Sequence, residues 1–157
     1  MAEIAHPQPS SDFERVVDLL GGTKVFRRRP AGPLDAHEML LAGLPGTALT
    51  HLVGSLEVLR PTAALERAIG MSLRTLQRRR EAPEKPLSQE QSGRAWKFAE
   101  ILARASAVLG SQEEAEQWLE RPALGLDGRR PIDLLSTPAG VELVEDFLRR
   151  LEYGVYV

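Results

Sequence analysis

Cysteine is absent from the 157-residue chain, which excludes disulfide bonds, thiolate metal ligands and a cysteine nucleophile. Aromatic residues are scarce at 5%, so Leu, Ala and Val must fill most of the core. No apolar run approaches the roughly 20 residues that a membrane-spanning helix needs. Residues 1–12 also lack the apolar centre of a signal peptide. These absences predict a cytoplasmic protein with no membrane partner.

Charge is nearly balanced overall, at −2, but it is unevenly distributed. Residues 60–85 hold seven basic and three acidic side chains, whereas residues 111–157 hold ten acidic and five basic ones. A basic middle and an acidic end predict two surfaces for two partners, one of them a polyanion. Uneven solvation of a single domain would give the same pattern, and charge alone leaves both interpretations open.

Apolar residues recur with helical spacing along most of the chain, and no two neighbouring segments have the pattern of paired strands. The sequence therefore predicts an all-α fold. The expected helices cover about residues 13–20, 35–42, 47–59, 62–69, 72–80, 88–109, 111–120 and 138–151, with a short turn at 131–135. Residues 24–33 have the composition of a linker, in which Val25-Phe26 is the one candidate strand.

Several helix ends carry capping residues. Asp35 is the expected N-cap of the second helix, and Ser88 with Gln91 forms a capping-box pair that opens the longest one. Thr137 is the expected N-cap of the last helix, with Pro138 at its first position. We divide the chain into an N-terminal helix and basic linker (1–34), a helix-turn-helix region (35–86), and a long helix plus C-terminal region (87–157).

Residues 62–80 have the size of a helix-turn-helix: two helices of about eight residues around Gly70-Met71. The polar residues of the second helix are the candidate DNA contacts, because Arg can fork to guanine, Gln can pair with adenine, and Ser and Thr can bind phosphates. They are Ser72, Arg74, Thr75, Gln77, Arg78 and Arg79. The alternative is an exposed Arg-rich helix end, since cations suit a helix C-terminus.

The most specific pattern lies near the end of the chain. Pro131-Ile132-Asp133-Leu134-Leu135 is followed by Thr137 and Gly140, and the chain closes with Glu152-Tyr153-Gly154-Val155-Tyr156-Val157. This order resembles the toxin-binding domain of the Xre/MbcA/ParS antitoxin family, particularly the Xre partners of RES-domain toxins. The basic segment upstream resembles the family's helix-turn-helix. The resemblance therefore extends from about Asp35 to the end, and implies a helix-turn-helix region followed by a small helical toxin-binding domain.

The resemblance also implies a function: a type II antitoxin that neutralises an NAD-degrading RES toxin by placing its C-terminus at the toxin's active site. Family members work as homodimers within larger complexes and often bind promoter DNA to repress their own operon. Gly154 permits a turn denied to other residues, and Val155 to Val157 supply apolar and aromatic anchors. The expected toxin-binding residues are Arg149, Arg150, Tyr153, Gly154, Val155, Tyr156 and Val157.

Other interpretations remain for these patterns. Without the resemblance, Tyr153, Val155 and Tyr156 would more simply fold back on the protein's own core. Pro131, Asp133 and Gly140 are expected to serve backbone geometry rather than to contact a toxin. A dimeric helix-turn-helix repressor with no toxin partner is the alternative function. A purely structural helical adaptor is a third.

An enzyme is not expected, and neither is a cofactor or a bound metal. The three histidines, His6, His37 and His51, form no zinc motif. Gly21-Gly22-Thr23-Lys24 superficially resembles a phosphate loop but lacks its first glycine and its preceding strand. A glycine pair that ends a helix explains it better.

Overall fold

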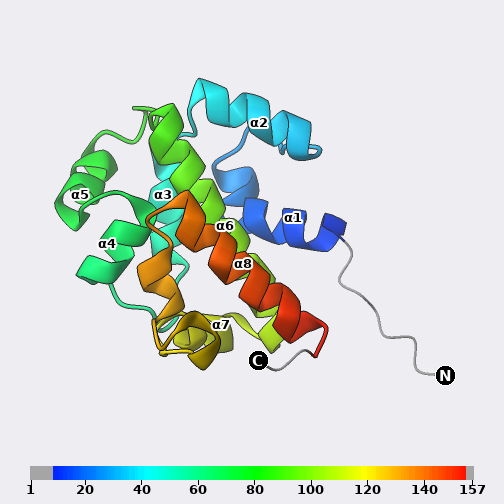
Figure 1. The fold of residues 1–157 in the computed structure, drawn as a ribbon. Coiled ribbons are helices and arrows are strands. Elements are labelled where there is room, and N and C mark those ends of the chain that lie inside the picture. Colours follow the sequence, from blue (N-terminus) through cyan, green and yellow to red (C-terminus); the bar gives the residue numbers. More distant parts are fainter. Residues whose placement is uncertain (1–8, 155–157) are drawn as a thin grey trace.

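The structure, a computed structural model, describes residues 9–154 (Figure 1). These residues form α-helices and short 3-10 helices with no named strand, so the predicted all-α class is confirmed. The helices are α1 (Pro9–Leu19), α2 (Pro33–Ala42), α3 (Gly46–Gly54), α4 (Ala63–Ile69), α5 (Leu73–Glu81), α6 (Gln89–Leu109), α7 (Gln112–Leu119) and α8 (Pro138–Glu152). The 3-10 helices are η1 (Gly22–Lys24), η2 (Leu124–Leu126) and η3 (Pro131–Leu134).

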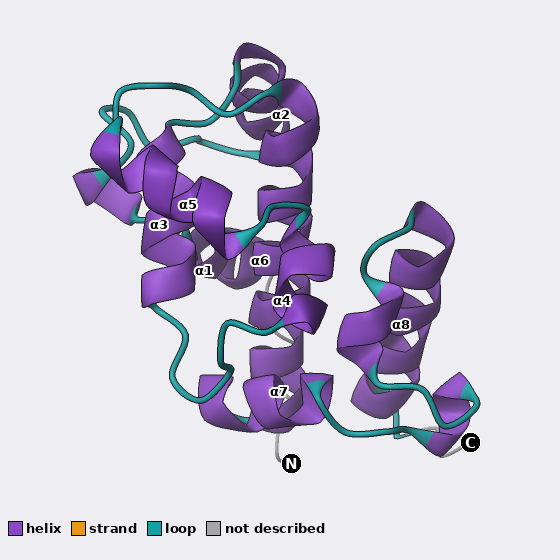
Figure 2. Ribbon diagram, turned by 90° about the vertical axis from the view of Figure 1, so that its left-hand side faces the viewer, coloured by secondary structure: helices purple, strands orange, loops and turns teal. Residues whose placement is uncertain are grey.

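Helix α6 is the centre of the fold. Helices α1, α2, α3, α4, α7 and α8 all pack against it, whereas α5 packs on α3 (Figure 2). The buried apolar side chains of these elements form one core, with Leu52, Leu65, Leu102 and Leu148 among its fully buried members. Ala95, Ala99 and Ala103 keep the inner face of α6 thin, so neighbouring helices can approach it closely.

The predicted caps mostly hold. Ser88 accepts a hydrogen bond from the Gln91 amide while the Gln91 side chain accepts one from the Ser88 amide, which completes the predicted capping box of α6. Thr137 caps α8 through the Gly140 amide, with Pro138 at the first helical position. These caps satisfy amides that a helix N-terminus otherwise leaves without partners, so they fix where the two longest helices begin.

Three predicted helix ends are wrong. Helix α1 starts at Pro9 rather than near Phe13. Helix α2 starts at Pro33 with Gly32 as its N-cap, and Asp35 accepts a bond from the Ala31 amide from inside the first turn. Helix α3 ends at Gly54 rather than near Leu59. The reason is Glu116 of α7, whose buried carboxylate accepts the amides of residues 57–59 at 2.8 to 3.0 Å. Those amides cannot also serve a continued helix.

The predicted linker at residues 24–33 is tied to the fold. It begins with the end of η1, and Val25-Phe26 forms no strand; Phe26 is instead buried in the core. Arg29 reaches back to α1, where its guanidinium donates to Asp18 at 2.9 Å and also to Glu14. The basic character of this segment is therefore partly neutralised by α1.

No helix in the described part of the chain is long and apolar enough to cross a membrane.

Candidate functional site

The turn between α4 and α5 is held by local hydrogen bonds. Thr62 caps α4, and Gly70 ends it in the left-handed conformation at φ 71°, which glycine adopts without strain. Ser72 then caps α5 by accepting the Thr75 amide at 3.1 Å. Glu66 of α4 accepts the Leu73 amide at 3.0 Å, so a carboxylate of the first helix binds the N-terminus of the second. The geometry is that of a helix-turn-helix.

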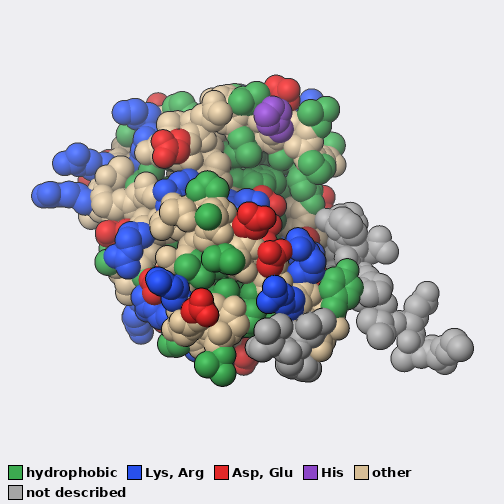
Figure 3. Space-filling model, in the orientation of Figure 1, with side chains coloured by type: hydrophobic (Ala, Val, Ile, Leu, Met, Phe, Trp, Pro, Cys, Tyr) green, Lys and Arg blue, Asp and Glu red, His purple; other side chains and the backbone are tan. Residues whose placement is uncertain are grey.

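The outer face of α5 is polar and accessible. Arg74, Gln77 and Arg78 are exposed, while Leu76 on the opposite side is buried against the core. Lys and Arg side chains project from the side of the molecule that carries α5 (Figure 3). The structure thus leaves these three side chains available to a polyanion, and their role in DNA binding remains a prediction.

The other three predicted DNA contacts are engaged within the protein. Ser72 and Thr75 bond to each other through their hydroxyls at 2.9 Å as part of the α5 cap. Arg79 donates to the Pro86 carbonyl at 3.0 Å and to the Gln91 side chain at 3.2 Å, which joins α5 to the loop before α6 and to the first turn of α6. The sequence predicted Arg79 to be available to DNA in the same way as Arg74 and Arg78. It did not reveal the internal bonds of Arg79, because the partners lie outside α5.

Helix α8 is a firmly seated support for the end of the chain. Val144 and Leu148 are fully buried on its inner side. At its start, Gly140 packs so closely on η3 that an added Cβ would overlap the Leu134 carbonyl oxygen. Phe147 stacks on Trp118 of α7, with ring centroids 6.0 Å apart and planes 8° from parallel. The helix therefore holds its C-terminal end in a fixed position.

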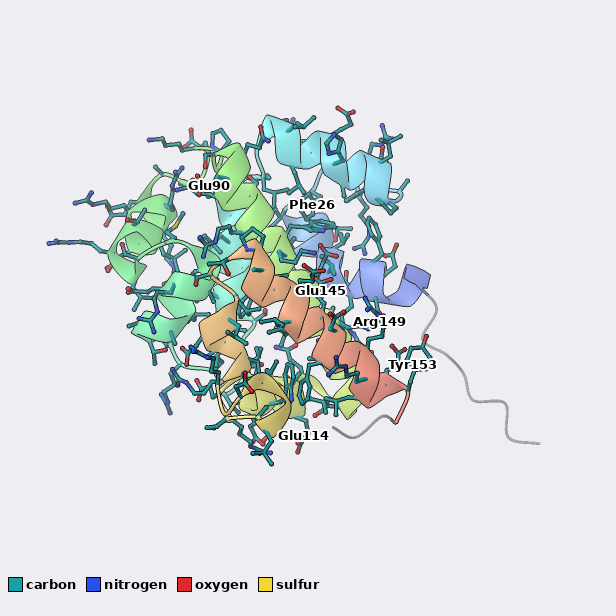
Figure 4. The ribbon with its side chains drawn as sticks, in the orientation of Figure 1. Phe26, Glu90, Glu114, Glu145, Arg149 and Tyr153 are labelled. Carbon is teal, nitrogen blue, oxygen red and sulfur yellow. The ribbon has the colours of Figure 1, made fainter. Side chains whose placement is uncertain are left out.

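Tyr153 stands at that end, with 65% of its surface exposed (Figure 4). The fold-back interpretation is therefore wrong for this side chain. Gly154 has φ +70°, as its predicted turn requires, and its amide bonds to the Leu151 carbonyl. Arg149 and Arg150 are exposed in the last turn, and Arg149 pairs with Asp146 at 2.8 Å. The predicted contacts Val155, Tyr156 and Val157 lie outside the described residues.

A charged cluster that the sequence did not reveal fastens the last turn of α8. Arg104 of α6 pairs with Glu152 of α8 and, at 3.6 Å, with Asp12 of α1. Glu152 is only 13% exposed, so this pair is screened less than a surface ion pair. The cluster joins three helices immediately before Tyr153. Nothing in local spacing links residues 12, 104 and 152, and only the tertiary fold brings them together.

A second cluster joins α4 to η3. Asp133 accepts two hydrogen bonds from Arg130, at 2.8 and 2.9 Å, and lies 3.7 Å from Arg67 of α4. Hydrogen bonding by Arg130, followed by the charges of Arg130 and Arg67, lowers the pKa of the Asp133 carboxyl below its usual value. Asp133 therefore serves the structure, as predicted, although its partners are guanidinium groups rather than backbone amides.

The two candidate surfaces lie on opposite sides of the molecule. Helix α5 and the C-terminal end of α8 are far apart in both ribbon views (Figures 1 and 2). Between them lies α6, which contacts α8 directly and is linked to α5 through α3 and through the Arg79–Gln91 hydrogen bond. One protein can therefore present a basic helix to one partner and its C-terminus to another.

A groove of about 790 Å³ lies among α1, α2, α6 and α8. Phe13, Leu40 and Trp96 are among its apolar lining residues. Lys97 of α6 and Glu145 of α8 also line it and are paired with each other at 3.4 Å. Among residues 9–154, no group of three His, Asp or Glu side chains is arranged to hold a metal ion.

Each of the two candidate surfaces lies in a part of the chain that matches a known protein family. Residues 35–100 match the antitoxin Xre-like helix-turn-helix domain. Residues 104–154 match the antitoxin Xre/MbcA/ParS C-terminal toxin-binding domain. The two matches meet within α6, so this helix is shared between the basic surface and the support of the C-terminus.

Individual relatives agree with these matches. Antitoxin Xre of Pseudomonas putida is 33% identical over 124 residues, which are 79% of this chain and 75% of the relative. Antitoxin Xre of Yersinia enterocolitica is 35% identical over 97 residues, 61% of this chain and 65% of the relative. The Prs ADP-ribosylating antitoxin of a Sphingobium species is 24% identical over 135 residues, covering 80% and 83%.

Proposed function

This chain belongs to the Xre/MbcA/ParS family of antitoxins, and we propose that it neutralises an NAD-degrading RES-domain toxin by placing its C-terminus at the toxin's active site. The observation that carries this proposal is the exposed Tyr153 at the end of a rigidly held helix. The name of the Sphingobium relative couples an antitoxin to ADP-ribosylation, a chemistry that consumes NAD, and so supports a toxin of this chemical class.

The physical basis is pre-organisation. Helix α8 is seated by Val144 and Leu148, and its last turn is fastened by the Arg104–Glu152 pair. A segment mounted on such a helix loses less freedom on binding than a free peptide. Tyrosine is a favoured anchor at protein interfaces.

Truncation tests the blocking role. A chain lacking Tyr153 to Val157 keeps the buried side of α8 intact, so it is expected to fold with an unchanged melting temperature and still bind the toxin. We expect it to lose inhibition of NAD hydrolysis in vitro and to fail to rescue cells that express the toxin. Leu34→Ser, which changes an exposed residue of α2, is the control that keeps full inhibition. Full rescue by the truncated chain would show that the C-terminus does not block the toxin.

The second part of the proposal is that the chain, as a homodimer, binds its own promoter through α5. Arg74, Gln77 and Arg78 support it, because they are exposed on the second helix of a helix-turn-helix. Arg74→Ala/Arg78→Ala is expected to weaken the binding of promoter DNA, seen as a mobility shift at higher protein concentration, and to reduce the salt dependence of binding by about two released ions. Arg149→Ala/Arg150→Ala removes the same charge from the far side and should leave the shift unchanged. Equal shifts for both variants would remove α5 from DNA recognition.

The alternative function is a dimeric repressor with no toxin partner. A second polypeptide that co-purifies with the chain distinguishes the antitoxin from this repressor. We also propose that the chain is not itself an enzyme, and the support is that the relatives it resembles are named antitoxins. Incubation of the isolated chain with NAD, followed by chromatography, should show no turnover.

A further inference from the structure

Two leucines of the C-terminal region are exposed on the described surface. Leu124 of η2 is 93% exposed and Leu143 of α8 is 54% exposed. Leu143 points away from the buried side of α8, since its neighbour Val144 is fully buried. Single exposed leucines are common on protein surfaces, so the question is whether these two belong to one patch.

Phe147 connects them. Leu143 precedes Phe147 by one helical turn, so the two side chains lie next to each other on α8. On the other side, Gly125 lies against the Phe147 ring so closely that a Cβ would overlap it, and Leu124 is the residue next to Gly125 in the chain. Trp118 of α7 stacks on the Phe147 ring. We call these four residues, Leu124, Leu143, Phe147 and Trp118, the apolar patch.

The loop that carries Leu124 is built rigidly. The Ala123 amide donates to the Arg129 carbonyl at 3.1 Å, and the Gly128 amide donates back to Ala123 at 2.9 Å, which closes the loop. Within it, Leu126 is buried. Leu124 is therefore held out in solvent by a closed loop with a buried anchor. An apolar side chain held in this way binds a partner without first having to be ordered.

We infer that the apolar patch is an anchoring surface for the toxin, separate from the C-terminus, so that the patch supplies affinity while the C-terminus supplies inhibition. The inference rests on the proposed function. The toxin is the occupant because the patch lies within residues 104–154, which match the toxin-binding domain. Leu143 and Tyr153 are also about 15 Å apart along α8 and about 80° apart around its axis.

A partner seated on the C-terminus would cover that distance. A protein interface of standard size buries about 800 Å² on each side, which corresponds to a patch roughly 30 Å across. Glu142, Asp146 and Arg150 flank Leu143 and Phe147 along α8 and are exposed or half-buried. An apolar centre with a charged border is the usual anatomy of a specific interface. Figure 3 shows this mixture of hydrophobic and charged side chains on the face that carries α8.

The test uses the full chain and the toxin that co-purifies with it, as a catalytically inactive variant. Leu124→Ser/Leu143→Gln is expected to raise the Kd for the toxin by about 10- to 100-fold, which is the range for loss of central interface anchors. The matched control is Leu34→Ser/Leu41→Gln, which changes two exposed leucines of α2, and its Kd should stay within about twofold of wild type. Thermal melts should be unchanged for both variants, because the altered side chains are exposed.

A Kd within about twofold of wild type for the patch variant would overturn the inference. If the same variant instead loses self-association by light scattering, the patch binds a second copy of this chain. The chain truncated after Glu152 tests the blocking mechanism of the proposed function independently of the apolar patch. If the truncated chain still inhibits, the blocking mechanism fails, yet the effect of the patch substitutions on its Kd is still measured.

Discussion

Glu116 shows how one residue can organise a segment far away in the sequence. Its carboxylate is fully buried in α7, yet it accepts the amides of residues 57–59 and the side chain of Gln112. Four donors surround one anion, so its charge is compensated inside the protein. The loop between α3 and α4 is therefore held by a single side chain.

We predict that Glu116→Ala destabilises the protein by roughly 3–5 kcal/mol, because it leaves several partly buried donors without an acceptor. For a domain of this size the melting temperature should fall by about 10 °C. Glu114→Ala, an exposed residue of the same helix, should change stability by about 0.5 kcal/mol or less. Similar melting temperatures for the two variants would contradict the role of the buried carboxylate.

Substitution of two glycines by alanine is expected to change the stability of the protein in opposite directions. At Gly140 an added Cβ would overlap the backbone of Leu134, whereas at Gly93 of α6 nothing lies within 4 Å of it. Gly140→Ala should therefore destabilise the protein by about 2 kcal/mol through overpacking. Gly93→Ala should stabilise it by about 0.5–1 kcal/mol, because alanine favours the helix. Urea denaturation measures both, and equal signs would contradict the close packing of α8 on η3.

At the scale of elements, the sequence predicted the helix starts that depend on residues close together in the chain. The helices from 88 to 109 and 138 to 152 begin at the expected caps, Ser88 and Thr137, because a cap and its partner are three residues apart. The errors come from long-range contacts. The end of α3 depends on Glu116, nearly sixty residues away, and the availability of Arg79 depends on Pro86 and Gln91 in another element. No local pattern encodes such partners.

The junction of α4 and η3 predicts a pH dependence. In the folded protein, the pKa of Asp133 is below its ordinary value because of Arg130 and Arg67. A lowered folded-state pKa gives stability that is present above the ordinary value, about 4, and is lost as pH falls through the folded value. Asp133→Asn should therefore lower stability at pH 7 and flatten its decline below about pH 4. Thermal melts from pH 7 to pH 2 measure this, and parallel curves for both proteins would exclude it.

In the whole molecule, the two candidate surfaces, α5 and the C-terminal end of α8, lie on opposite sides of the core. Helix α5 rests on α3, and α8 rests on α6, η2 and η3. Substitutions at distant sites with no shared partners have additive effects. Arg74→Ala/Arg78→Ala should therefore weaken promoter binding and leave the Kd for the toxin unchanged. Truncation after Glu152 should abolish inhibition of the toxin and leave promoter binding unchanged.

The combined variant tests whether this separation is complete. If the surfaces are independent, its loss of DNA affinity and its loss of toxin inhibition should equal those of the two parents, within about 0.5 kcal/mol for each. Mobility shifts at fixed salt and an NAD hydrolysis assay measure the two quantities on the same preparation. A larger departure would show that α6 couples DNA binding to toxin binding. This helix packs against α8 and is linked to α5 through α3 and through the Arg79–Gln91 hydrogen bond.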